Sequence, residues 1–185
     1  NASMATEVLT EGYENQLEPN FEVLKYFLPT LDYREEIEGF TLEAGQSRSI
    51  TRPCIVKGPI VVKAGGLLSI QGVEMILGQD SGVKSEGGQL EIRDSRICAA
   101  EGCRGTLLTV KNMPRLVLEN VCFDGQKRAG AIEAEGGVLE GKNCNFENCT
   151  KIGDGGAVYG WGCNMYFEHF TFRECYSSGN GGAIY

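Results

Sequence analysis

The sequence predicts an all-β fold, a right-handed parallel β-helix of about six coils with a short N-terminal capping helix. The first observation is an internal repeat near the C-terminus, where residues 146–159 return 26 positions later as residues 172–185. In both copies a Phe is followed by a Cys, then by Gly-Gly-Ala and a β-branched residue. Repetition without insertion indicates one supersecondary unit used twice, which is typical of a solenoid.

Two further columns of apolar residues keep intervals of 22 to 26 positions through the upstream sequence. The first column consists of Leu68, Leu90, Leu116, Leu139 and Met165, and the second of Met75, Ile97, Phe123, Phe146 and Phe172. Equivalent residues in successive coils of parallel strands lie about 4.8 Å apart. We therefore expect the second column, here called the core ladder, to stack through the interior of the fold.

Each eight-residue block between the two columns is mostly apolar at positions 1, 3, 6 and 8, which is strand alternation with one interruption. The interruption lies at position 5, where the residues are Gly72, Asp94, Asn120, Asn143 and His169. Gly, Asn and Asp tolerate the left-handed backbone that a sharp corner requires. Each block is therefore predicted to form a strand, a one-residue corner and a second strand.

The β-branched residue after Gly-Gly-Ala marks another column, which we expect to continue upstream through Ile132, Thr109, Val83 and Val61. The glycine pairs of these units favour tight turns between coils, because glycine adopts the left-handed backbone without a steric penalty. The 26 glycines of the chain therefore indicate close turns and not disorder.

The chain has 185 residues, enough for one domain with a continuous core. Residues 39–185 follow the repeat and form the predicted β-helix, whereas residues 1–38 form an N-terminal arm. Within the arm, residues 20–28 read as an amphipathic helix with Asn20 as N-cap and Pro29 as terminator. The apolar residues of this helix include Phe21, Leu24 and Phe27. We expect the helix to cap the N-terminal end of the core or, alternatively, to dock on a partner.

The formal net charge of -8 disfavours nucleic acid and anionic membrane surfaces as partners, since both need clustered Lys and Arg. No segment of the sequence approaches the roughly 18 consecutive apolar residues of a membrane-spanning helix. We therefore do not expect the chain itself to cross a membrane.

Eight cysteines are many for this length, yet none lies in the paired CxxC spacing of a structural zinc site. No metal and no cofactor is therefore predicted. Cys149 and Cys175 occupy equivalent positions in neighbouring coils, but parallel stacking points their side chains the same way, which disfavours a disulfide. We expect buried thiols that pack as small apolar residues. The alternative is disulfides, with Cys98 and Cys103 as a local pair.

Position 4 of each block is expected to face outward, and its residues form what we call the charge ladder: Gln71, Arg93, Glu119, Lys142 and Glu168. Charges of alternating sign predict a salt-bridged ladder that holds the register of neighbouring coils. The alternative is a carbohydrate-active enzyme, which needs carboxylates that converge. Its catalytic residues would be Asp94, Glu119, Lys142 and Glu168. The single histidine, His169, is expected to replace Asn at a corner, and a general base is the alternative.

Tyr159 and Tyr185 each follow a residue expected to face inward, so we predict that both face outward and stack on neighbouring coils. Trp161 lies close to them in the sequence. Exposed aromatic residues bind sugars or protein partners. The alternative role is a cross-strand pair that stiffens the sheet.

The Gly-Gly-Ala units at residues 155–158 and 181–184, with the Phe-containing segments before them, resemble the repeats of chlamydial-type polymorphic outer-membrane proteins. The resemblance covers about residues 120–185. This chain has Cys149 and Cys175 where that family has Asn. The resemblance implies a β-helical surface adhesin, at the cell surface or secreted. The upstream coils resemble the β-helix fold shared by pectin lyases and polygalacturonases.

The expected function is that of a non-catalytic β-helix scaffold or binding module for protein–protein or surface contacts. It would be an adhesin-like fragment or an accessory subunit of a large assembly, the second implying a processed subunit of an organellar or membrane-associated complex. Protein partners are expected at the N-terminal arm, at the outward aromatics or at an open C-terminal edge at Tyr185. A glycan is the alternative ligand, and a pectin-lyase-like enzyme is the alternative function.

Overall fold

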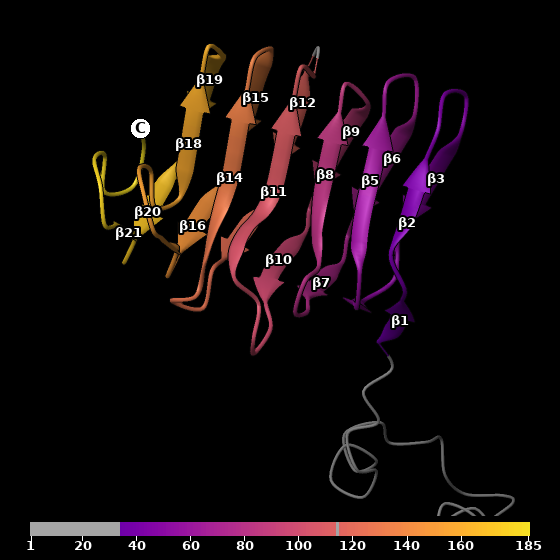
Figure 1. Cartoon of the computed structure of the whole chain (residues 1–185), viewed down its shortest axis with the longest axis horizontal. Coiled ribbons are helices and arrows are strands. Elements are labelled where there is room, and N and C mark those ends of the chain that lie inside the picture. The colour runs from indigo at the N-terminus through magenta and orange to yellow at the C-terminus, as the bar shows by residue number, and fades with distance from the viewer. Residues whose placement is uncertain (1–33, 114) are drawn as a thin grey trace, which may run out of the picture. The chain divides into compact units, whose positions relative to one another are not determined.

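Short strands that pair in parallel build the fold, in a computed structural model that describes residues 34–113 and 115–185 (Figure 1). Sheet A consists of β1 (Glu35–Ile37), β4 (Cys54–Val56), β7 (Glu74–Leu77), β10 (Arg96–Ala99), β13 (Cys122–Asp124), β16 (Asn145–Glu147) and β20 (Thr171–Arg173). Sheet B consists of β2 (Phe40–Leu42), β5 (Pro59–Lys63), β8 (Gly82–Glu86), β11 (Gly105–Lys111), β14 (Ala129–Glu135) and β18 (Val158–Trp161). Sheet C consists of β3 (Ser47–Ile50), β6 (Leu67–Gln71), β9 (Gln89–Arg93), β12 (Leu116–Glu119), β15 (Val138–Lys142) and β19 (Asn164–Glu168). A two-stranded sheet D adds β17 (Thr150–Lys151) and β21 (Tyr176–Ser177).

The chain visits sheets B, C and A in turn, so three sheets of six, six and seven strands wrap one core. The predicted parallel β-helix of about six coils is confirmed. The predicted capping helix at residues 20–28, with Phe21, Leu24 and Phe27, lies outside the described residues. Strand β1 falls within the predicted arm of residues 1–38 but pairs with β4 of the β-helix.

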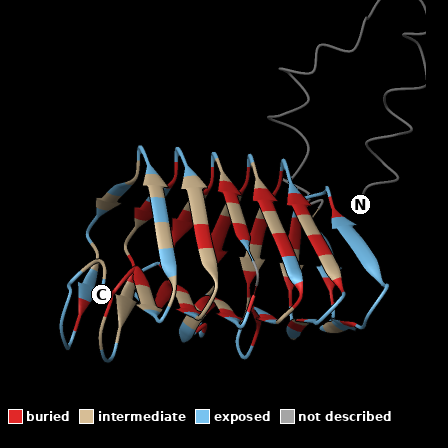
Figure 2. Ribbon diagram, turned by 90° about the horizontal axis from the view of Figure 1, so that it is seen from above, coloured by how far each residue is buried: buried red, intermediate tan, exposed pale blue. Residues whose placement is uncertain are grey.

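The core ladder runs through sheet A as predicted. Its members pair in sequence from Met75 to Ile97, Phe123, Phe146 and Phe172. The ring of Phe146 stacks on Phe123 at 5.2 Å and on Phe172 at 5.0 Å between centroids. Figure 2 shows buried residues alternating along the strands with residues of intermediate burial, whereas exposed residues lie mainly at the turns. The alternation arises because successive side chains of a strand point to opposite faces.

The predicted corners between sheets C and A have the expected backbone. Their φ angles are positive at Gly72 (66°), Asp94 (49°), Asn120 (54°), Asn143 (52°) and His169 (55°). The side chains continue the ladder, because Asn120 Nδ2 donates to Asp94 Oδ1 at 2.8 Å and Asn143 Nδ2 donates to Asn120 Oδ1 at 3.0 Å. Asn and Asp therefore serve two purposes here, a left-handed backbone and a bond to the next coil.

The predicted column through Val61 and Thr109 is wrong by one position at both residues. Ile132 pairs with Leu108, and Val83 pairs with both Leu108 and Ile60. Both Ile60 and Leu108 are buried, whereas Val61 and Thr109 point to the opposite face. The number of residues between equivalent positions of successive coils differs from one column to another. A spacing taken from one column therefore misplaces residues of another column by one position. Such a slip of one residue exchanges the two faces of a strand.

Glycine at position 141 makes room for an aromatic ring of the next coil. A Cβ at Gly141 would collide with the ring of Phe170, whose centroid stacks 4.1 Å from that of Phe167. The preceding coils carry Leu118, Ile92 and Ile70 at this position. A small residue in one coil is therefore compensated by a large one in the next, which keeps the core filled.

Candidate functional site

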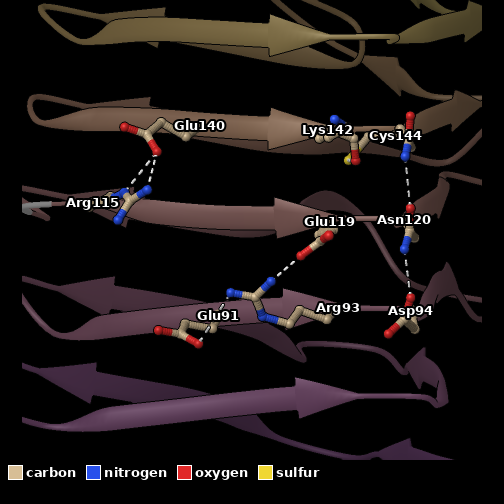
Figure 3. A network of polar contacts seen from close by, with 10 residues as sticks. Glu91, Arg93, Asp94, Arg115, Glu119, Asn120, Glu140, Lys142 and Cys144 are labelled. Atoms are coloured by element: carbon tan, nitrogen blue, oxygen red, sulfur yellow. Dashed lines mark hydrogen bonds and ion pairs between the residues drawn. The ribbon is translucent and has the colours of Figure 1, made fainter.

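The outward face of sheet C carries the charge ladder, and its charges pair between coils (Figure 3). Arg93 forms an ion pair with Glu119, and Lys142 Nζ lies 3.0 Å from Glu168 Oε1. Beside the ladder, Arg115 Nε donates to Glu140 Oε2 at 2.8 Å. The predicted salt-bridged ladder is therefore present, with Gln71 in register with Arg93.

Three of the residues proposed for an enzymatic alternative, Glu119, Lys142 and Glu168, line an open groove of about 660 Å³ on this face, whereas Asp94 does not line it. Asp94 lies at a corner and accepts its hydrogen bond from Asn120, as Figure 3 shows. Glu119 pairs with Arg93, and the hydrogen bond from Lys142 lowers the pKa of the Glu168 carboxyl. Each of these three carboxylates thus accepts a hydrogen bond or an ion pair from a neighbouring side chain, and Arg93 also lies 3.9 Å from the carboxylate of Glu91.

The single histidine occupies the predicted corner. His169 has a left-handed backbone, and its Nδ1 atom lies 3.6 Å from Glu168 Oε1 on an exposed part of the surface. Its backbone therefore matches that of Asn143 in the preceding coil, which agrees with the expected role in place of Asn.

The outward face of sheet B carries the predicted aromatics. The rings of Tyr159 and Tyr185 stack at 5.7 Å between centroids with an interplanar angle of 4°. Trp161 is 63% exposed. Tyr159 and Trp161 line a shallow depression of about 310 Å³. Glu133 and Glu135, their partners in the adjoining strand β14, complete its lining. We call Glu133, Glu135, Tyr159 and Trp161 the aromatic hollow.

Lysines neutralise both carboxylates of the aromatic hollow. Lys151 Nζ lies 2.7 Å from Glu133 Oε2 and 4.7 Å from the centroid of the Tyr159 ring. Lys111 Nζ lies 2.9 Å from Glu135 Oε2, and the hydrogen bond that Lys111 donates to this carboxylate raises the pKa of Lys111. A cation already lies over one aromatic face, which is a geometry that such rings favour.

Sequence reasoning found the aromatic residues of the hollow but missed its carboxylates. Glu133 and Glu135 precede Tyr159 and Trp161 by 26 positions, the same interval that defines the C-terminal repeat. Applying that interval to the outward positions of β14 would have placed them side by side. The sequence signal was therefore present for the carboxylates, whereas Lys151 comes from β17, outside sheet B, and its contact with Glu133 carries no such signal.

All eight cysteines are free thiols, so Cys98 and Cys103 do not form a disulfide in this structure. Cys149 is buried and Cys175 is half-buried, one coil apart. The hydrogen bond between the two side chains lowers the pKa of Cys175, and the same bond together with burial raises that of Cys149. The more deeply buried Cys149 therefore holds its proton more tightly than Cys175 does.

Comparison with known proteins found no matching protein family, no matching curated protein and no matching solved structure. Within the described residues, no helix is long and apolar enough to cross a membrane. Across the same part of the chain, no three His, Cys, Asp or Glu side chains are grouped so as to hold a metal ion.

Proposed function

We propose that this protein is a non-catalytic β-helix scaffold that binds a protein partner through the outward face of sheet B. The observation that carries the proposal is the contrast between the two faces. On sheet C the charged side chains satisfy one another between coils. On sheet B the aromatic hollow presents the exposed Trp161 and the half-buried, stacked Tyr159 beside two carboxylates that are paired with lysines. Exposed Trp and Tyr are the residues most enriched at binding hot spots.

A rigid coil suits this role, because the backbone that presents the aromatic side chains is held by ladder hydrogen bonds on both sides. Strand β18 pairs with β14, and Tyr185 N donates to Val158 O at 3.0 Å from the next coil. A surface that is already ordered loses little conformational entropy when a partner binds. An adhesin-like fragment and an accessory subunit of an assembly both use a surface of this kind.

The test is capture of partners from the native source by the immobilised protein, followed by mass spectrometry. We expect a stoichiometric partner that is lost with the double variant Tyr159→Ala/Trp161→Ala. Tyr166→Ala is the matched control, because Tyr166 is 61% exposed on sheet C. Deletion of residues 1–33, which leaves β1 intact, separates a contribution of the arm. Equal capture by the double variant and the control would contradict the proposed surface.

The rival function is a carbohydrate-active enzyme that uses Asp94, Glu119, Lys142 and Glu168. A polysaccharide-cleavage assay distinguishes the two, with Glu119→Gln as the variant. Turnover by the unmodified protein that is abolished in Glu119→Gln would overturn the non-catalytic proposal. A glycan array with the unmodified protein tests for a sugar ligand, and glycan binding that requires Trp161 would replace the protein partner.

A further inference from the structure

A basic pocket lies next to the aromatic hollow, at the edge where sheet A leads into sheet B. Four cationic side chains line it against two acidic ones, Glu101 and Glu133, and its volume is about 810 Å³. The cations are Arg104, Lys127, Arg128 and Lys151, with Thr150 and Ile152 beside them. Arg104 belongs to the loop between β10 and β11, and Arg128 to the loop between β13 and β14. Three successive coils therefore build the pocket, which shares Glu133 and Lys151 with the surroundings of the aromatic hollow.

The basic pocket differs in charge from the rest of this acidic protein. Both of its lysines have partners, since Lys151 pairs with Glu133 and Lys127 Nζ lies 2.8 Å from Glu174 Oε2. Among the described residues, Arg104 and Arg128 form no ion pair with any carboxylate. A guanidinium is a rigid fork of donors that matches the two oxygens of a carboxylate. Two unpaired forks in one pocket select an anionic ligand.

An apolar residue stands beside these cations. Ile152 is 93% exposed, the highest value among the large hydrophobic residues described, and it lines the same pocket. Burial of apolar surface contributes about 25 cal/mol per Å². A ligand with an aliphatic side chain next to its carboxylates would therefore gain from both kinds of contact, whereas a sulfated sugar would leave Ile152 in water.

The backbone of the pocket also favours a peptide. Strand β17 pairs with β21 in a two-stranded sheet, so within the described residues one of its edges has no strand beside it. Thr150 and Lys151, the two residues of this strand, line the pocket. An extended peptide adds to an unpaired strand edge through main-chain hydrogen bonds, which a sugar does not supply in this pattern.

We infer that the basic pocket binds an acidic peptide segment of a protein partner, with carboxylates on Arg104 and Arg128 and an aliphatic side chain on Ile152. The inference rests on the proposed function, because it names the chemistry of the partner. It adds a second contact region that adjoins the aromatic hollow, so one partner chain can reach both.

The test is fluorescence anisotropy of the full chain with a fluorescein-labelled peptide that alternates glutamate and leucine. The double variant Arg104→Ala/Arg128→Ala should weaken binding by about tenfold or more, since two charge-assisted contacts are lost. The matched control is Arg52→Ala/Arg173→Ala, which removes two exposed arginines outside the pocket. Circular dichroism melting confirms that both double variants fold. Ile152→Ser should weaken the peptide with leucine more than a peptide of glutamate alone.

The outcomes separate the inference from its rivals. Weaker binding of the same peptide with glutamine in place of glutamate, and no change in the control variant, would support it. Equal loss in both double variants would overturn it in favour of general charge attraction. Binding of a labelled heparin oligosaccharide without binding of the peptide would overturn it in favour of an anionic glycan. Partner capture that needs Tyr159 and Trp161 but neither arginine would retain the proposed function and reject this pocket.

Discussion

The core ladder and the charge ladder repeat with the same coils, yet they hold the protein in different ways. Phe146 of the core ladder is fully buried between two stacked rings. Glu119 and Lys142 of the charge ladder are roughly half exposed at their side chains. Apolar side chains contribute most to folding stability when they are fully removed from water. Exposed ion pairs contribute little, because water screens the attraction between their charges. We infer that the core ladder supplies stability and that the charge ladder mainly maintains register and solubility.

The largest effect is expected from truncation of the core ladder. Phe146→Ala removes a ring that contacts Phe123, Phe170 and Phe172, and it should lower the free energy of unfolding by about 3–5 kcal/mol. Urea unfolding followed by circular dichroism measures the change. Phe146→Leu is the control, because it retains most of the volume and should cost less. If Phe146→Ala lowered the free energy of unfolding no more than Glu119→Gln does, the inference that the core ladder supplies most of the stability would be contradicted.

The next largest loss of stability is expected where the small Gly141 of one coil faces the large Phe170 of the next. Gly141→Ala places a methyl group against the ring of Phe170, and overpacking of this kind costs about 1–3 kcal/mol. Phe170→Leu alone should also destabilise the protein, because it leaves space above Gly141. The double variant Gly141→Ala/Phe170→Leu should be more stable than the sum of the single changes predicts. Strict additivity in a double-mutant cycle would show that the two positions do not share space.

A smaller effect is expected at the corners that separate the two ladders. Asn120→Ala places alanine at a φ of 54° and removes both side-chain bonds of the corner. The left-handed backbone alone costs a non-glycine residue about 1–2 kcal/mol. Asn120→Gly keeps the backbone freedom and isolates the contribution of the hydrogen bonds. Equal destabilisation by both changes would assign the effect to hydrogen bonding and not to backbone conformation.

The smallest change in stability is expected from loss of an ion pair in the charge ladder, and this change depends on pH. The hydrogen bond from Lys142 lowers the pKa of the exposed Glu168 carboxyl in the folded state. The pair therefore stabilises the fold above the ordinary pKa of Glu, and this contribution is lost as pH falls through the folded-state pKa. NMR titration should show the pKa of Glu168 rising toward its ordinary value in Lys142→Met. A stability difference between the two proteins that persisted at acid pH would contradict this account.

Much of the fold could be predicted because a repeat in the sequence becomes a repeat in space. The core ladder, the corner residues such as Asn120, and the alternating charges all lie in register as expected. Each depends on a local rule, either strand alternation or the steric demand of a left-handed backbone. The column through Val61 and Thr109 failed because it assumed that different columns share one spacing.

The candidate site was only partly predictable for a related reason. Tyr159 and Trp161 could be assigned to the outward face from alternation alone, and the stacking of Tyr159 on Tyr185 followed from the repeat. The basic pocket was not foreseen, because Arg104 and Arg128 lie in loops between strands. Loop residues follow neither the strand period nor the interval of the repeat, so their neighbours in space are not visible in the sequence.

The sequence by itself determined the coil, since apolar residues recurring at intervals of 22 to 26 positions are buried most simply by stacking one coil on the next. Only the tertiary structure decided what the coil presents to a partner. Lys151 reaches Glu133 and the ring of Tyr159 across coils, and three loops bring two arginines and Ile152 to one pocket. The physical reason is that burial constrains the inward positions one by one, whereas the surface depends on which loops meet.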